Sequence, residues 1–394
     1  MNKKALLIVV IIVLILSSIS TALVVEGRKR EDPGSVIWDA EGWDNFAMDG
    51  TDFFISDGVL YGGGVYLQQP FGEQGHVIAV DLEENELLWN HNHNMPTARI
   101  NSVHGSNDII YSGSYSGDIV AADADNGELL WDHSYHDYLV WSVHSSDNAV
   151  YSGCRDGLVV SADADSGEKL WEHTFHDSTI ISVYSSEGFV YSSSGDGSVV
   201  VVDADSGEMQ WSHQHHEGPV GSLYVLDNIV YSGGGEGELI AYDAEKQEKL
   251  WSHSHHDETV SSIYVQDGVV YSGDGDGYVI ASDSSDGEKL WSHSYHKESS
   301  SRSSWWTGVD AIISIQVVDG DVYSLDNNGN ALAVEAEGSL TLGMSRAWAS
   351  FLGTASEYLG VIVLISVIIL IVVGAIWGSS RVWPKESSTD RKFP

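Results

Sequence analysis

The sequence repeats itself with a forty-residue period through most of its length. Tryptophans mark one position of the repeat, at Trp131, Trp171, Trp211, Trp251 and Trp291. Each unit holds short stretches rich in Val, Ile and Tyr, separated by turn-forming dipeptides such as Asp156-Gly157. The stretches alternate apolar and polar residues and lack helical spacing, which predicts strands. A period near forty built from several short strands is typical of a β-propeller blade.

A tyrosine expected on the second strand of each unit gives the number of blades. It occurs at seven positions: Tyr61, Tyr111, Tyr151, Tyr191, Tyr231, Tyr271 and Tyr323. The fourth-strand tryptophan occurs only six times after the first blade begins, at Trp89 and the five positions above, and Trp38 precedes that blade. We therefore predict an all-β fold, a seven-bladed propeller of four-stranded antiparallel blades. The strand around Trp38 is expected to complete the last blade and close the ring.

Two apolar runs, residues 5–25 and 358–378, flank the repeats and predict transmembrane helices, since each can cross roughly 30 Å of hydrocarbon. Basic residues follow the second run, so the tail is expected in the cytoplasm and the propeller outside the cell. Ser20-Thr21-Ala22 resembles a cleavage site, so the first run is either a retained anchor or a removed signal peptide. The expected order is signal peptide or anchor 1–30, propeller ectodomain 31–340, juxtamembrane linker 341–357, transmembrane helix 358–378 and cytoplasmic tail 379–394.

The charge balance limits the partners of the chain. Asp and Glu number 58 against 18 Lys and Arg, a net charge of −40. Such a chain repels phosphate backbones, so no nucleic-acid partner is expected. Acidity with so little lysine suggests a halophilic, high-salt environment. The single cysteine, Cys154, excludes an intramolecular disulfide and a multi-cysteine metal site.

One motif carries a resemblance to a known family. The spacing Ala121-x-Asp123-x-x-x-Gly127-x-x-x-Trp131 resembles the tryptophan-docking motif of pyrroloquinoline-quinone-type (PQQ-like) propeller repeats. The blade ending at Trp251 departs from it with Gln247 in place of glycine. The resemblance implies that each tryptophan packs between neighbouring blades. It assigns a structural role to Trp38, Trp89, Trp131, Trp171, Trp211, Trp251 and Trp291.

A second pattern is similar to the WD repeat, although the tryptophan of that family's third strand is absent. In that family a loop histidine, a second-strand serine and a turn aspartate hydrogen-bond within one blade. The matching sets are His136/Ser152/Asp156, His176/Ser192/Asp196 and His256/Ser272/Asp276, with His216/Ser232/Glu236 as a variant.

Histidines also recur in five repeats as Trp-x-His-x-x-His. They form either a ring of imidazoles that binds a transition metal, or one structural histidine in each blade. A metal site needs three or four ligands at one place, whereas a repeat spreads one per blade, so the structural interpretation is favoured. No catalytic, cofactor-binding or metal-binding residue is assigned.

Two functions from different classes fit these features. The favoured one is a non-catalytic, membrane-tethered, extracytoplasmic propeller that acts as a scaffold for a protein or envelope component. The alternative is a quinoprotein-type oxidoreductase or another enzyme, with its site in irregular insertions of the first and last blades, near residues 64–74 and 298–308. Quinone dehydrogenases resemble eight-bladed rings with an adjacent-cysteine disulfide. No cofactor, and in particular no PQQ, is therefore expected here.

Overall fold

The computed structural model describes residues 36–39, 46–47, 52–66, 74–96, 99–146, 148–294, 311–327 and 331–335, all within the first of two compact units, residues 1–337 and 338–394. Every regular element in these ranges is a β-strand. Both apolar runs lie outside them, as do residues 67–73 of the first expected insertion and all of the second, residues 298–308. Within the described part of the chain, no helix is long and apolar enough to cross a bilayer.

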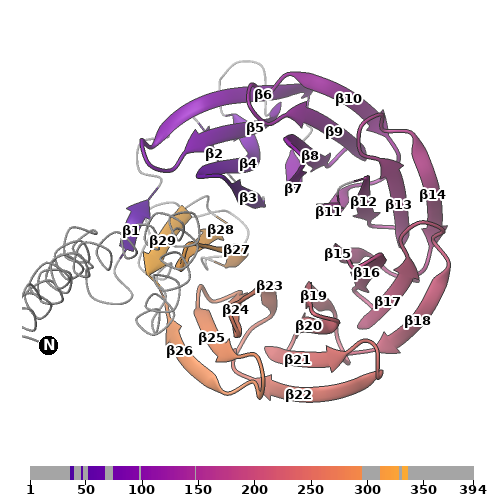
Figure 1. The fold of residues 1–394 in the computed structure, drawn as a ribbon, viewed down its shortest axis with the longest axis vertical. Helices are drawn as coiled ribbons and strands as arrows, with labels where there is room; N and C mark the ends of the chain where they lie inside the picture. Colours follow the sequence, from indigo (N-terminus) through magenta and orange to yellow (C-terminus); the bar gives the residue numbers. More distant parts are fainter. Residues whose placement is uncertain are drawn as a thin grey trace, which may run out of the picture. The chain divides into compact units, whose positions relative to one another are not determined.

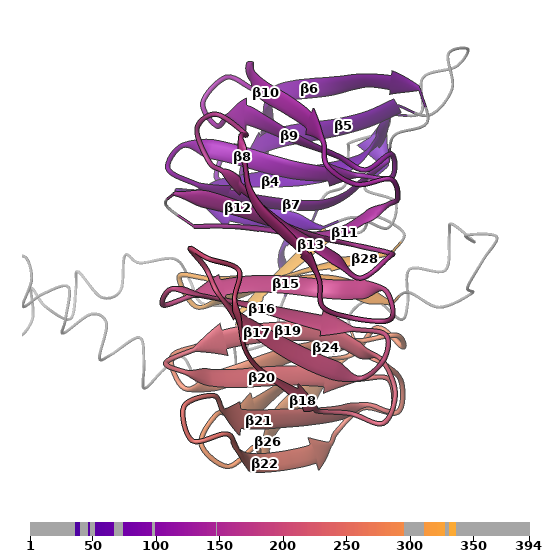
Figure 2. The same ribbon diagram turned by 90° about the vertical axis from the view of Figure 1, so that its right-hand side faces the viewer.

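The strands form seven antiparallel sheets arranged as the blades of a propeller (Figures 1 and 2). The first blade contains β2 (Phe46–Ala47), β3 (Phe53–Ser56), β4 (Val59–Tyr66), β5 (Gln74–Asp81) and β6 (Glu86–Pro96). The second and third contain β7 (Ile100–Ser106), β8 (Ile109–Ser114), β9 (Asp118–Asp123), β10 (Leu129–Ser134), β11 (Val140–Ser145), β12 (Ala149–Cys154), β13 (Leu158–Asp163) and β14 (Lys169–Thr174). The fourth and fifth contain β15 (Ile180–Ser186), β16 (Phe189–Ser194), β17 (Ser198–Asp203), β18 (Met209–Gln214), β19 (Val220–Leu226), β20 (Ile229–Gly234), β21 (Glu238–Asp243) and β22 (Glu248–Ser254). The sixth contains β23 (Val260–Gln266), β24 (Val269–Asp274), β25 (Val279–Asp283) and β26 (Lys289–His293).

The seventh blade closes the ring as the tryptophan count predicts. It contains β27 (Ile312–Val318), β28 (Asp321–Asp326), β29 (Ala331–Glu335) and, at its outer edge, β1 (Val36–Asp39). β1 pairs antiparallel with β29, and Trp38 lies opposite Ala333. The predicted all-β, seven-bladed fold and its closure by the N-terminal segment are confirmed.

The hydrophobic core lies between the blades rather than within one of them. In one cluster, Tyr111 and Ile119 of the second blade pack against Val140 and Val143 of the third. Gly113 permits this approach, because a Cβ there would lie 2.6 Å from a methyl carbon of Val140. Corresponding clusters recur around the ring, so each blade is stabilised mainly by its neighbours.

The first blade departs from the repeat. Its β4 continues to Tyr66 and pairs with β5 up to Gln74, so the sheet extends into the segment expected to be an insertion. The additional strand β2 pairs with the far end of β4, beyond the part that pairs with β3. The sequence gives no sign of this short strand.

Candidate functional site

The innermost strands surround a central cavity of about 600 Å³. In six blades the innermost strand carries a β-bulge near its start, which places one extra residue opposite its partner strand. Because a bulge re-aims a side chain, the extra residue faces the cavity. These residues are Asn101, Trp141, Ile181, Gly221, Ser261 and Ile313.

A serine follows the bulge in each of these six blades, and all six line the cavity: Ser102, Ser142, Ser182, Ser222, Ser262 and Ser314. Two of them tie adjacent blades together. The hydroxyl of Ser102 accepts a hydrogen bond from the Val143 amide at 3.0 Å, and that of Ser142 accepts one from the Val183 amide at 3.0 Å.

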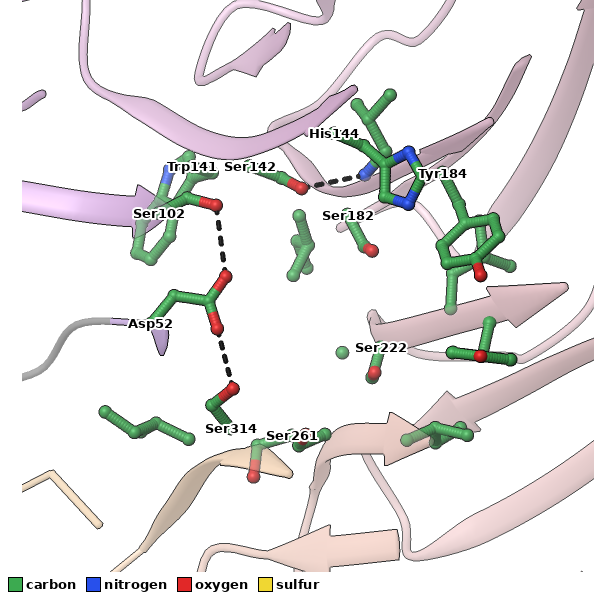
Figure 3. Close-up of a pocket in the computed structure, with 18 of the residues that line it drawn as sticks. Asp52, Ser102, Trp141, Ser142, His144, Ser182, Tyr184, Ser222, Ser261 and Ser314 are labelled. Atoms are coloured by element: carbon green, nitrogen blue, oxygen red, sulfur yellow. Dashed lines mark hydrogen bonds between the residues drawn. The ribbon is translucent and has the colours of Figure 1, made fainter. Parts of the chain in front are cut away.

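Asp52 occupies the seventh place in this ring of serines (Figure 3). Its Oδ1 accepts hydrogen bonds from the Ser314 hydroxyl at 2.6 Å and the Phe53 amide at 2.9 Å. Its Oδ2 accepts one from the Ser102 hydroxyl at 3.2 Å. Burial raises the pKa of Asp52 from 3.8 to about 6, against the opposing effect of these donors. One carboxylate therefore breaks the symmetry of the cavity wall.

A collar of rings lies two residues further along the inner strands and also lines the cavity: Phe54, His104, His144, Tyr184, Tyr224 and Tyr264. Successive ring centroids are 4.9, 4.0, 4.2, 4.9 and 5.0 Å apart, so the rings, tilted by 34–56° to one another, form a continuous row around the cavity. Gln316 closes the collar, since its side-chain amide accepts from the Ile55 amide at 2.7 Å and donates to the Ile55 carbonyl at 3.0 Å.

The two collar histidines share one tautomer. Nδ1 of His104 accepts from the backbone amide of Ser145 at 3.2 Å, and Nδ1 of His144 accepts from that of Ser185 at 3.2 Å. The neutral ring therefore carries its proton on Nε2. Burial lowers the pKa of His104 to about 4 and the pKa of His144 well below 6.5. Both are neutral at pH 7, so Asp52 is the only charged side chain among the described residues that line the cavity.

The lining also bears on the quinone cofactor that the repeat's name implies. In the part of the chain that the structure describes, no lysine or arginine surrounds the cavity. The carboxylates of PQQ would meet no counter-charge there, and Asp52 would repel them. The central cavity therefore does not fit this cofactor. Across the described residues, no three His, Cys, Asp or Glu side chains come together as a metal site.

The tryptophans lie between blades. Trp131 Nε1 donates to the Ala164 carbonyl of the next blade at 3.0 Å, and Trp89, Trp171 and Trp251 make the corresponding bond. The motif glycine of the next blade lies against the indole, and a Cβ on Gly167 would be 2.8 Å from Trp131. In the blade that follows Trp211, Gln247 stands in the position of that glycine, and Trp211 is the more exposed of these rings. Trp291 is buried, and Trp38 lies outside the described side chains.

The structure brings each predicted histidine to its serine. The Nε2–Oγ distances are 2.7 Å for His136 and Ser152, 2.8 Å for His176 and Ser192, 2.7 Å for His256 and Ser272, and 3.0 Å for His216 and Ser232. The sequence missed a further pair, His93 and Ser112, at 2.9 Å.

The acidic partners differ from the WD-like pattern. Nδ1 of His256 donates to Asp274 at 2.8 Å rather than to Asp276, and Nδ1 of His216 faces Glu238 at 3.5 Å rather than Glu236. Asp196 lies 3.6 Å from Nδ1 of His176, which also bonds to Ser198 at 2.9 Å.

Asp156 accepts from the Leu158 amide at 3.2 Å and from the thiol of Cys154 instead of bonding to His136. Nδ1 of His136 is buried without a hydrogen-bond partner among the described atoms. The Leu158 amide of its own hairpin turn holds the Asp156 carboxylate, which directs it away from His136.

Comparison with known proteins agrees with this geometry. Residues 73–138, 116–225 and 221–347 match the PQQ-repeat family model described as outer membrane protein assembly factor BamB. The chain belongs to this family. The crystal structure of the computationally designed protein Ika8 is 20% identical to it, with a TM-score of 0.58 over 77% of this chain and 100% of that one, which shows the fold alone. No curated protein matches the chain.

Proposed function

We propose that this chain is a non-catalytic scaffold that binds a protein partner outside the cytoplasm. Membership of the BamB-type repeat family supports protein binding as its role. The observation that carries the proposal is a belt of exposed leucines on the outermost strands of five blades, the first, second, third, fifth and sixth. We call these residues the leucine belt: Leu88, Leu130, Leu170, Leu250 and Leu290, which are 44–54% exposed.

Each residue of the leucine belt lies immediately before the blade's tryptophan, where the outer strand bulges away from its neighbour. The bulge sends the tryptophan inward and the leucine outward. Repeated exposure of large apolar side chains on a sheet edge is unusual for a surface with no partner. Glu128 and Glu168 begin the same strands, or lie next to them, and are exposed. The occupant is therefore a protein segment with apolar side chains and basic residues.

The membrane tether belongs to the same proposal. Two charge-free apolar runs flank the propeller in sequence, and basic residues follow the second. We propose that they hold the propeller on the outer side of the cell membrane, with the tail in the cytoplasm, and that its acidity suits molar salt. Unfolding of the ectodomain at low salt and its persistence in molar salt would support the last point. Equal stability in both would contradict it.

Photo-cross-linking in native envelopes tests the scaffold. A photoreactive side chain replaces Leu170 in one variant and Asp137, an exposed loop residue, in a matched control. We expect a discrete cross-linked protein from position 170 and little from position 137. A single partner captured equally from both positions would contradict the leucine belt as the docking surface. No cross-linked protein from either position would contradict the scaffold.

A further inference from the structure

We propose that the central cavity is a binding site for a primary ammonium group, which Asp52 and the surrounding serine hydroxyls would recognise. This inference does not depend on the leucine belt, which lies on the opposite, outer side of each blade. It starts from the one blade in which the serine of the cavity wall is replaced by another residue. Six blades place a serine at that position and one places a carboxylate.

The hydrogen bonds of Asp52 hold its two oxygens unequally. Oδ1 accepts short bonds from Ser314 and Phe53, whereas the bond from Ser102 to Oδ2 is longer. The backbone amide of Val103 also donates to the carboxylate. Figure 3 shows the carboxyl group between the two serines, at the edge of the open cavity. A carboxylate has about four lone-pair positions, so a ligand's donor would replace the long bond from Ser102. An ammonium group supplies a charge-assisted donor, which is the stronger kind.

The charge of the cavity selects a cation over an anion. Among the described residues, Asp52 is the only charged side chain that lines it, and no lysine or arginine accompanies it. The net charge of −40 also raises the local concentration of cations around the molecule. Anionic ligands such as phosphates and carboxylates are disfavoured for both reasons.

The rest of the wall fits the body of an amine. Six serine hydroxyls can accept the remaining N–H groups, and the collar rings offer an apolar floor with π-electrons toward which cations are attracted. A volume of about 600 Å³ is within the range of small-molecule sites. The ammonium group comes from a free small amine or from a lysine side chain of a partner protein, and the two sources share this chemistry.

The test uses the full chain in micelles of a non-ionic detergent and n-butylammonium as the probe. Saturation-transfer NMR detects weak binding through the ligand's own protons. We expect transfer to the butyl chain of butylammonium and much less to butanol, its neutral counterpart. Because a charge-assisted bond is lost, Asp52→Asn should weaken binding about tenfold or more. Equal transfer to butanol in the wild-type protein would overturn the proposal without recourse to any variant.

The matched control is Asp57→Asn. Asp57 is exposed, lies five residues away and has a positive φ of 50° that asparagine tolerates, so the change removes the same charge outside the cavity. We expect its affinity for butylammonium to stay within about twofold of wild type. If both variants lose binding alike, general attraction to an acidic protein explains it and the site is refuted. N-acetyl-lysinamide distinguishes the sources, because tighter binding than butylammonium indicates a partner's lysine and weaker binding a free amine.

Discussion

The outer tryptophans and the inner cavity wall are both built from repeated positions, yet they differ in how strictly the repeat is kept. On the outer side, Trp89, Trp131, Trp171 and Trp251 make the same hydrogen bond to the next blade. On the inner side, the serine position changes to Asp52 in one blade, and the collar changes from Phe54 through histidine and tyrosine to Gln316. Positions that hold blades together must be alike, whereas a site for one ligand must be unique.

The largest expected effect is a loss of folding stability in acid, which protonates buried histidines both in the collar and in the histidine–serine pairs. Burial lowers the pKa of His104 and His136 to about 4 and the pKa of His93 and His215 to about 3. Since the unfolded state binds protons first, stability should fall as the pH drops below 6.5. Each of these four should cost about 2 kcal/mol at pH 5.

Urea unfolding at pH 7 and pH 5 measures this loss. Most carboxylates remain ionised at pH 5, so relief of charge repulsion offsets little of it. His136→Gln should reduce the pH dependence of the free energy of unfolding. The control, His133→Gln at an exposed position, should leave that dependence unchanged. A free energy of unfolding that is flat between pH 7 and pH 5 would contradict the neutral, buried state of these rings.

The second prediction compares two tryptophans of the same repeat. Trp131 is 8% exposed, bonds to the next blade and packs on Gly167, whereas Trp211 is more exposed and the blade after it has Gln247 in place of that glycine. Trp131→Ala should reduce the free energy of unfolding by about 3–5 kcal/mol, and Trp211→Ala by about half of that. Chemical denaturation gives both values, and equal losses would mean that the motif glycine adds nothing to the docking.

The third prediction separates backbone strain from packing at that glycine. Gly167 and Gly188 both have positive φ, 70° and 81°. A Cβ at Gly167 would lie 2.5 Å from His133, but one at Gly188 would meet nothing within 4 Å. Gly188→Ala should cost about 1 kcal/mol from conformation alone, and Gly167→Ala about 1–2 kcal/mol more. Similar melting temperatures for the two variants would show that Trp131 and His133 move to make room for the methyl group.

The smallest effect is expected on the inner wall, and it has the opposite sign. Burial raises the pKa of Asp52 to about 6, so its ionised form destabilises the folded state at neutral pH, and protonation restores stability as the pH falls through 6. Asp52→Asn should therefore stabilise the protein by about 1–2 kcal/mol at pH 7.5, after allowance for the weakened serine bonds. The gain should vanish near pH 4, where thermal unfolding of both proteins should coincide. Destabilisation at pH 7.5 would assign Asp52 a purely structural role.

The sequence predicted what repetition makes visible. The spacing of tryptophans and tyrosines fixed the number of blades, and the surplus Trp38 identified the strand that closes the ring. The histidine–serine pairs followed from the same periodicity, but their acidic partners were displaced by two positions at Asp274 and Glu238. Hairpin geometry decides where a turn carboxylate points, and sequence spacing does not contain it.

The cavity was missed for a different reason. Its residues come from the innermost strand of every blade and the residues just before it, three to five from each, so no local motif contains the site. The signal that could have found it is one position of the repeat that holds a serine in six blades, from Ser102 to Ser314, and Asp52 in the first blade. An alignment of the repeats, searched for a position at which one blade differs from all the others, would have identified that carboxylate.

The pairing of β1 with β29 also has a mechanical consequence. Because the two strands are antiparallel, Val36 lies opposite Val334, and the chain enters and leaves the ring at the same corner. Tension applied between these two points would separate the two strands from one end, breaking one hydrogen bond at a time rather than all together. The ring is thus weakest along the direction in which two anchored ends would pull it.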